Sequence, residues 1–330
     1  MSLRDLAAAG GVRVGAAVND QIFGSGDKHY RSLLADEFNS VTAERAMKWL
    51  WIHPEPDRWD WEASDELVEF ADAHQMQVRG HTVVWPHWGT PDYITQCADA
   101  DALRQHLVDH VRELFSHWEG SVARVDVVNE PLHWLEGRPA DSAWRTLLGE
   151  DYLADVLTVA HEADSTIELW INETHTEVIP DKHDLFTRIV ADLVERGLPL
   201  HGIGIQGHQL YPDFSPGPPD PDQLYRGVTT FADMGLEVAV TEMDVLAHPT
   251  DPDRLDVQGR IYGELVDAAL SVDACREITF WGVSDAHSWV DEHFGADRAP
   301  LLFDREGHPK PAYDAVAAAF ASRAHRTPVG

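Results

Sequence analysis

Residues 125–131, VDVVNEP, place an amide and a carboxylate, Asn129 and Glu130, directly before Pro131. The valine-rich run favours an extended strand, and its nearly continuous apolar character is typical of a parallel sheet covered on both faces. Because proline cannot continue the hydrogen-bond ladder, we expect the strand to stop there and leave Glu130 at its carboxyl-terminal end. A carboxylate at that place is a candidate general acid or base. Taken alone, an Asn-Glu pair at a strand end is more often a helix cap or a loop anchor.

A second carboxylate, Glu242, lies near the end of a similar run, residues 236–245 (LEVAVTEMDV). Glycoside hydrolysis needs two carboxylates, one to protonate the leaving oxygen and one to attack or to activate water. Carboxyl groups about 5–5.5 Å apart indicate retention of configuration and a gap of about 6.5–9.5 Å indicates inversion, and the residues alone leave both open. Asn129 is placed to bind a sugar 2-hydroxyl, and His208 to orient Glu242 and keep it ionised.

Short β-branched runs alternate along the chain with longer amphipathic segments, which predicts an α/β protein. The expected strands are residues 12–18, 37–44, 77–85, 123–130, 166–173, 202–208, 236–245 and 277–285. The expected helices include residues 64–74, 101–118, 151–163, 184–197, 221–234 and 258–271. Eight strands alternating with helices predict a (β/α)₈ TIM barrel that forms a single domain over residues 1–330, with its active site at the carboxyl ends of the strands.

Polar and aromatic residues gather at those expected strand ends, whereas a random arrangement would scatter them over both ends of the barrel. They are Glu44, His81, Trp85, Asn129, Glu130, Asn172, Glu173, Gln206, His208, Glu242 and Trp281. The joint pattern predicts a site at one rim.

Trp85 and Trp281 offer flat apolar faces for sugar rings. We expect other tryptophans to serve packing, such as Trp59, Trp61 and Trp118. Lys48 is one of only four lysines and is predicted to donate to sugar hydroxyls. The alternative for Lys48 is a solvated surface side chain.

The composition limits the possible partners. A formal net charge of −32 excludes a general affinity for nucleic acid or anionic membranes, and no apolar run approaches the roughly 20 residues of a membrane span. An acidic, lysine-poor surface suits concentrated salt, where self-repulsion is screened. A salt-adapted source is therefore one hypothesis, and an ordinary acidic surface is the other.

The first residues and the two cysteines bear on where the protein is located and on whether its thiols are paired. Residues 1–5 do not read as a secretory leader, so either the protein stays inside the cell or a leader was removed. Cys97 and Cys275 fit no metal spacing and are interpreted as free thiols.

Nineteen histidines raise the alternative of a metal-dependent hydrolase on the same barrel. His106 and His110 have helical i, i+4 spacing, but they lie on a segment expected outside the barrel and far from Glu130. No His-x-His pair ends the first strand, and no phosphate loop, dinucleotide glycine pattern or serine nucleophile elbow is present. We therefore expect neither a metal nor a cofactor.

Seven stretches over nearly the whole chain resemble glycoside hydrolase family 10, whose typical members are endo-β-1,4-xylanases. They are residues 38–49 (FNSVTAERAMKW), 79–85 (RGHTVVW), 125–131, 202–208 (GIGIQGH), 240–245 (VTEMDV), 279–289 and 300–313. The resemblance implies a retaining barrel enzyme with Glu130 as acid/base and Glu242 as nucleophile. It implies sugar binding by Glu44, Lys48, His81, Trp85, Asn129, His208 and Trp281. We add Arg45, Trp88, Asn172, Gln206 and Trp289 to the expected binding site.

The chain departs from the family pattern in three places. Arg45 stands where the family usually has Asn, and residues 86–89 (PHWG) replace His-Ser-Gln with one residue more. Residues 172–175 read NETH where the family has Asn-Asp-Tyr-Asn. The changes fall on the glycone side or the nearby rim, so Arg45 is expected to favour a charged or differently decorated substrate, or to shorten that side of the cleft.

The sequence therefore predicts a retaining endo-β-1,4-xylanase that acts as a monomer on xylan or xylo-oligosaccharides. One alternative is a related β-glycosidase that acts on short xylo-oligosaccharides or another decorated β-glycan. The other is a catalytically silent barrel that only binds carbohydrate or protein. Glu130, Glu242, Asn129 and His208 argue against the silent barrel, because a binding module does not need two opposed carboxylates.

Overall fold

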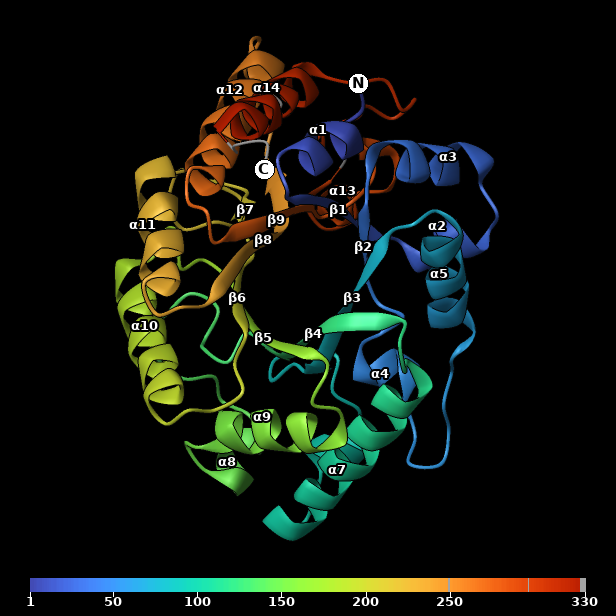
Figure 1. Cartoon of the computed structure of the whole chain (residues 1–330), viewed down its shortest axis with the longest axis vertical. Coiled ribbons are helices and arrows are strands. Elements are labelled where there is room, and N and C mark those ends of the chain that lie inside the picture. Colours follow the sequence, from blue (N-terminus) through green and yellow to red (C-terminus); the bar gives the residue numbers. More distant parts are fainter. Residues whose placement is uncertain (249, 296, 327–330) are drawn as a thin grey trace.

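The strands form a closed parallel barrel (Figure 1). The computed structural model describes residues 1–248, 250–295 and 297–326. The ring runs β1-β2-β3-β4-β5-β6-β8-β9 and closes because β9 pairs with β1. Within this part of the chain, the strands are β1 (Arg13–Val18), β2 (Ser40–Ala43), β3 (Gln77–Val84), β4 (Val122–Asn129), β5 (Glu168–Glu173), β6 (Gly202–Ile205), β7 (His208–Gln209), β8 (Glu237–Val245) and β9 (Cys275–Phe280). The predicted (β/α)₈ barrel is confirmed.

Helices surround the ring of strands (Figure 1). They are α1 (Leu3–Ala9), α2 (Asp20–Gly24), α3 (Lys28–Glu37), α4 (Trp49–Ile52), α5 (Glu62–Ala73), α6 (Asp92–Thr95), α7 (Ala100–His117), α8 (Ala143–Leu148), α9 (Tyr152–Ala163), α10 (Pro180–Glu195), α11 (Pro221–Ala232), α12 (Arg254–Leu270), α13 (Trp289–Phe294) and α14 (Pro311–Arg326), with a 3₁₀ turn at Asp285–His287. Helix α14 packs against both α12 and α1, so the first and last helices lie side by side.

Local sequence explains how an outer helix such as α11 begins and which face it buries. Asp220 caps it by accepting from the backbone N–H of Gln223, and Pro221 occupies the first turn, where a missing N–H costs nothing. The buried residues follow i, i+3, i+4, i+7 spacing, which forms one apolar stripe toward the sheet. These residues are Leu224, Gly227, Val228 and Phe231.

Three expected strands differ from the observed ones by three residues or more at one end, and the other five differ by one or two. The expected strand 202–208 is interrupted at Gln206 and Gly207, because Gly207 has a left-handed φ of +80° that breaks the extended ladder. In place of the expected strand 37–44, the observed strand β2 covers only residues 40–43, because α3 extends to Glu37. The expected strand 277–285 begins earlier and ends at Phe280.

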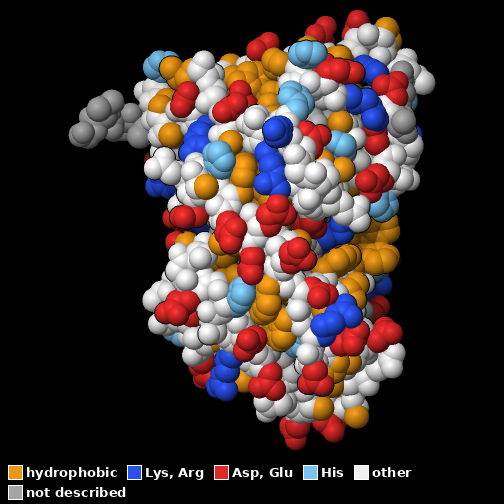
Figure 2. All heavy atoms as spheres, turned by 90° about the vertical axis from the view of Figure 1, so that its right-hand side faces the viewer, with side chains coloured by type: hydrophobic (Ala, Val, Ile, Leu, Met, Phe, Trp, Pro, Cys, Tyr) orange, Lys and Arg blue, Asp and Glu red, His pale blue; other side chains and the backbone are white. Residues whose placement is uncertain are grey.

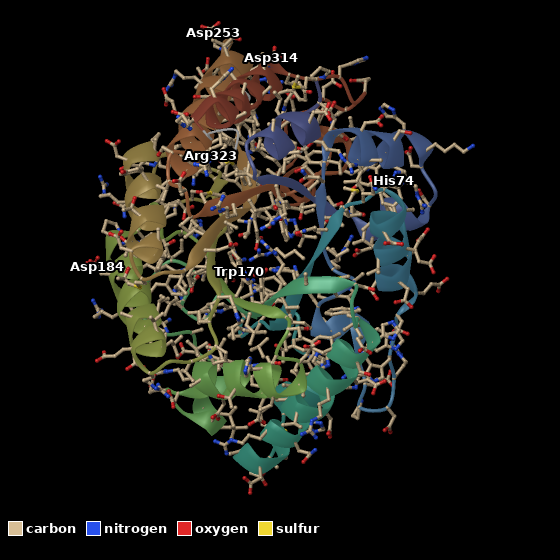
Figure 3. All side chains as sticks on the ribbon, in the orientation of Figure 1. His74, Trp170, Asp184, Asp253, Asp314 and Arg323 are labelled. Atoms are coloured by element: carbon tan, nitrogen blue, oxygen red, sulfur yellow. The ribbon has the colours of Figure 1, made fainter. Side chains whose placement is uncertain are left out.

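Below the mouth, the barrel interior holds charged side chains around a tryptophan. Figure 3 shows Trp170 within the ring of strands, where it is fully buried. The guanidinium groups of Arg79 and Arg124 lie 4.7 and 5.3 Å from its ring centroids. Nε of Arg79 donates to Asp126 at 3.0 Å, and Arg124 donates to Glu277 at 3.1 Å. This layer forms a polar floor under the site.

The molecular surface carries more acidic than basic side chains (Figure 2), in agreement with the excess of Asp and Glu over Lys and Arg in the sequence. Figure 2 shows acidic side chains spread over one face of the molecule, with fewer basic ones between them. No helix in the described ranges combines the length and apolar character that a membrane crossing requires. Cys97 and Cys275 are both free thiols, as predicted.

Candidate active site

Glu130 and Glu242 come from strands separated by β5 and β6 in the ring (Figure 1). Strand β4 ends at Asn129, and Glu130 follows it with a left-handed φ of +52°. Few non-glycine residues adopt this conformation, and those that do cluster at functional sites. Glu242 lies within β8 and is 5% exposed.

Two asparagines link the two carboxylates. The amide nitrogen of Asn172 donates to Oε1 of Glu242 at 2.7 Å and to Oδ1 of Asn129 at 2.9 Å. The amide of Asn129 in turn donates to Oε1 of Glu130 at 3.4 Å. Oδ1 of Asn172 accepts from the hydroxyl of Thr241 at 2.6 Å, which fixes the orientation of its amide. The carboxylates therefore share one hydrogen-bonded site.

Irregular register at the carboxyl ends of the strands places these side chains. Shifts occur between Asp126 and Val128 where β4 pairs with β5, and between Val240 and Met243 where β8 pairs with β9. A third shift lies in β3, after His81. An extra residue in one strand turns the following side chains to the other face. The shifts therefore decide which residues point into the mouth.

Side-chain donors hold both oxygens of Glu130. The indole N–H of Trp85 donates to Oε2 at 3.0 Å, and the amide of Gln206 donates to Oε1 at 2.8 Å. Gln206 also donates to Asn129 at 3.2 Å. The direction of the Glu130 carboxyl is thereby set by residues at the ends of β3, β4 and β6.

His208 holds Glu242 from the other side. Its Nε2 lies 3.2 Å from Oε2 of Glu242 and its Nδ1 lies 2.8 Å from Oδ1 of Asp244. Burial alone would raise the pKa of Glu242, but the hydrogen bond from His208 and the positive charges of His81, His208 and Lys48 hold it below its usual value. Glu242 is therefore set up to be ionised.

Aromatic and cationic groups border the carboxylates. Lys48 is 6% exposed, so the solvated alternative for this residue is wrong. Its ammonium lies 4.4 Å from the ring centroid of Trp85 and 5.6 Å from that of Trp281. The indole N–H of Trp289 donates to Asp244 at 2.8 Å, and Trp281 lies edge-on to His81, with ring centroids 5.5 Å apart.

Glu44 and Arg45 extend the site beyond β2. The backbone N–H of Ala46 donates to Asp20 at 3.0 Å, which holds Asp20 under this turn. Burial and the charge of Glu44 raise the pKa of Asp20 to about 6, although Arg45 and Lys48 oppose the shift. Burial also raises the pKa of Glu44. Arg45 is half-buried and forms no ion pair or side-chain hydrogen bond with any described residue.

Trp88 is set apart from the hydrogen-bonded centre, with 69% of its surface exposed. Its segment is anchored at Gly89, whose carbonyl accepts from the N–H of Leu50 at 2.9 Å. Trp51 approaches Gly89 closely and is itself 39% exposed. The structure thus brings together the expected residues of the centre and leaves Arg45 and Trp88 outside it.

Sequence reasoning missed Asp244 and Asp126. Asp244 positions His208, and Asp126 accepts from Nδ1 of His81 at 2.9 Å, so each carboxylate orients an imidazole beside Glu242. Asp244 follows Glu242 by two residues in β8, and this i, i+2 spacing was an available signal. Asp126 had no such signal, because a charged residue inside a valine-rich strand gives no indication of its partner.

The histidines of α7 lie outside the mouth, as expected. His110 is fully buried and stacks on Trp49 with ring centroids 3.6 Å apart, and its Nδ1 lies 3.0 Å from Nδ1 of His53. Among the residues that the structure describes, side chains close enough to share a metal ion are Asp304, Glu306 and His308, in a largely exposed turn.

The chain is similar to known xylanases over most of its length. The model of "Glycosyl hydrolase family 10" matches residues 2–319. The beta-1,4-xylanase of Dictyoglomus thermophilum is 35% identical over 306 residues, which cover 86% of this chain and 83% of that protein. Native xylanase 10B from Thermotoga maritima is 33% identical with a TM-score of 0.91, covering 99% of this chain and 100% of that one.

The structure of xylanase 10B from Thermotoga petrophila in complex with xylobiose is also 33% identical, with a TM-score of 0.91 and 98% coverage of both chains. A model match over nearly the whole chain, together with this identity and coverage, shows the family. The chain belongs to glycosyl hydrolase family 10.

Proposed function

We propose that the protein is a retaining endo-β-1,4-xylanase that hydrolyses internal β-1,4-xylosidic bonds of xylan and acts as a monomer. The observation that carries this proposal is the chain of contacts Glu130–Asn129–Asn172–Glu242 at the carboxyl ends of β4, β5 and β8. It joins two carboxylates through amide donors and leaves the pKa of one of them lowered. The xylanase names of the relatives support xylan as the substrate class.

In the first step, Glu242 attacks the anomeric carbon of the sugar bound on the glycone side. The bond from that carbon to the leaving oxygen breaks, and Glu130 transfers its proton to that oxygen. The product is a glycosyl ester on Glu242 and a shortened chain with a new hydroxyl. Asn129, whose amide nitrogen keeps a second hydrogen beyond the one given to Glu130, is placed to donate to the sugar near the reacting carbon, where charge develops.

In the second step, water attacks the same carbon from the side that the leaving chain vacated. Glu130, now ionised, takes the proton from the water, and the carboxylate of Glu242 leaves. Two inversions give net retention. The contact between His208 and Glu242 supports both steps, because a held carboxylate is a better oriented nucleophile and a stabilised leaving group.

The bordering residues are proposed to bind the xylose units. Trp85, Trp281 and Trp289 provide ring faces, while Lys48 and Glu44 provide charged hydrogen-bonding groups. His81 and Gln206 complete the site by their contacts beside Glu242 and Glu130.

Product analysis tests the proposal. Wild-type protein incubated with glucuronoxylan should release a ladder of xylo-oligosaccharides, and Glu242→Ala should release none. Proton NMR during the first minutes should show the β anomer at the new reducing ends before mutarotation. Early appearance of the α anomer would refute retention. Binding of xylan without release of any product, from aryl β-xylosides as well, would favour the silent barrel.

One observation favours a second candidate, a preference for acidic side groups. Arg45 is half-buried, and its guanidinium forms no ion pair or side-chain hydrogen bond with a described residue, although its charge acts on the nearby Glu44 and Asp20. Arginine recognises carboxylates with paired donors. We therefore expect Arg45 to interact with a uronic acid substituent on a xylose bound at the glycone side.

A further inference from the structure

A buried ion pair, Glu173–Lys182, lies directly beneath the backbone that follows Glu130. We propose that this pair is a positioning element for Glu130: it fixes the loop after β4 and thereby holds the acid/base carboxyl in place. The inference rests on the proposed function of Glu130. Neither residue contacts the reacting atoms, so both are positioning residues and not catalytic ones.

The pair is enclosed completely. Nζ of Lys182 lies 2.9 Å from Oε1 of Glu173, and both side chains are fully buried. A buried ammonium or carboxylate is costly unless it is paired and hydrogen-bonded. In a chain with so few lysines, a fully buried one with a single carboxylate partner indicates a specific structural task.

The carboxylate of Glu173 binds the backbone of the loop after β4 through hydrogen bonds. Its Oε2 accepts from the backbone N–H of Leu132 at 2.9 Å, and its Oε1 accepts from the N–H of Thr174 at 2.8 Å. Leu132 is only two residues beyond Glu130, and a rigid proline lies between them. Both oxygens act as acceptors, which is what an ionised carboxylate provides. Burial raises the pKa of Glu173, and the Lys182 ammonium opposes that shift.

Lys182 forms a hydrogen bond with the same loop at a second residue, Trp134. Its ammonium also donates to the carbonyl of Trp134 at 3.2 Å, and that carbonyl accepts from His175 at 3.1 Å. On the opposite side, the carbonyl of Leu132 accepts from Nε2 of His87 at 2.8 Å. The loop is therefore fastened from both sides within four residues of Glu130.

Glu130 needs such a hold because its backbone is strained. A φ of +52° in a residue that is not glycine persists only when the surroundings enforce it. Its own N–H donates to the carbonyl of Asn172 at 2.8 Å, which fixes the strand side. The contacts of Leu132 and Trp134 fix the other side. Without them, Glu130 would be free to relax away from the leaving oxygen, which is the atom it must reach.

Lys182→Met tests this role, because it removes the ammonium and keeps an unbranched apolar side chain. The test compares kcat/KM for two aryl β-xylobiosides. A phenolate needs a proton to leave, whereas a dinitrophenolate leaves without one. We expect an approximately 10²-fold loss for the phenyl substrate and for xylan, and a change within about twofold for the dinitrophenyl substrate. Loss of stability alone would lower all three equally.

Azide provides a second readout. It attacks the glycosyl ester without needing a general base and displaces Glu242 from the anomeric carbon. With the dinitrophenyl substrate, azide should therefore speed turnover by Lys182→Met and yield a β-xylobiosyl azide, while the wild type should respond little. Absence of any azide effect in the variant, together with equal losses on all substrates, would overturn the inference.

Two further variants distinguish the proposed positioning role from a general effect on folding. Lys310→Met is the matched control, since Lys310 also forms a buried ion pair, with Asp285 at 2.7 Å. It should show no dependence on the leaving group. If Lys182→Met does not fold, the double variant Glu173→Gln/Lys182→Met leaves no unpaired charge and should show the same leaving-group pattern. Failure of the wild type on every substrate would refute the proposed function instead.

Discussion

The Nε2 atom of His208 lies 3.2 Å from Oε2 of Glu242, and the opposite ring nitrogen lies 2.8 Å from Oδ1 of Asp244. Ionised carboxylates accept hydrogen bonds and do not donate them, so both ring nitrogens donate and the imidazole is charged. Burial would lower the pKa of His208, but Asp244 and Glu242 together raise it well above its usual value. The nucleophile therefore has a buried cation as its permanent partner.

His208→Asn should move the acid limb of the activity profile to higher pH. The lowered pKa of Glu242 keeps this carboxylate ionised, and activity present, below its ordinary value of 4.5. Removing the imidazole takes away the main lowering influence, so protonation and loss of kcat/KM should begin at higher pH. His106→Asn on α7 is the matched control. An unchanged acid limb in His208→Asn would contradict the assigned relationship.

Gly204→Ala should disconnect the two carboxylates. A Cβ at this position of β6 would lie 2.1 Å from Oδ1 of Asn172 and 2.9 Å from the methyl group of Thr241. Asn172 must then turn, and its bonds to Glu242 and Asn129 would be lost. We expect kcat/KM for xylan to fall about 10²-fold. In Gly24→Ala, where the nearest atom is 3.7 Å away, activity should be retained. Full activity of a folded Gly204→Ala would show that the amide link is dispensable.

Glu277 should make the protein sensitive to acid. Burial would raise its pKa, but Arg124, Arg79 and Arg13 lower it to about 2 from 4.5. Because the folded pKa is depressed, the stabilisation is complete above pH 4.5 and disappears as the pH falls toward 2. A shift of this size corresponds to about 3 kcal/mol. Urea unfolding between pH 6 and pH 2 should show a steeper decline for the wild type than for Glu277→Gln. Parallel declines would contradict the prediction.

Arg45→Asn should change substrate preference and leave the chemistry intact. The loss of a charge-assisted contact with a uronic acid group should lower kcat/KM for a glucuronic acid-substituted xylo-oligosaccharide about 10–100-fold. The unsubstituted oligosaccharide of equal length is the internal control and should be cleaved as before. A parallel loss on both substrates would instead assign Arg45 to general sugar binding.

The surface charge predicts the response to salt. With a net charge of −32, self-repulsion should destabilise the folded chain at low ionic strength. Raising sodium chloride from about 0.05 M to about 1 M should therefore raise the free energy of unfolding and preserve xylan hydrolysis. Steadily falling stability and activity over that range would refute the salt-adapted hypothesis.

Sequence alone was sufficient for the barrel and for the proposed carboxylates. Valine-rich runs such as residues 125–131 favour buried parallel strands, and Pro131 marks where that strand ends. Carboxyl ends of parallel strands meet at one rim, so Glu130 and Glu242 could be placed together before any coordinates. The separate helical segments followed from apolar spacing and capping residues in the same local way.

Tertiary structure alone decided how those residues meet. The register shifts near Asp126 and Val240 come from strand pairing, which a single run of residues does not encode. The partners of His208 are Glu242 and Asp244, which are distant in the sequence, and the break at Gly207 that precedes His208 was not foreseen. Lys182 of α10 meets Glu173 at the end of β5 only because the chain folds back between them. Hydrophobic periodicity specifies which face is buried, whereas hydrogen bonds and ion pairs depend on atoms within about 3 Å, and only the closed barrel sets those distances.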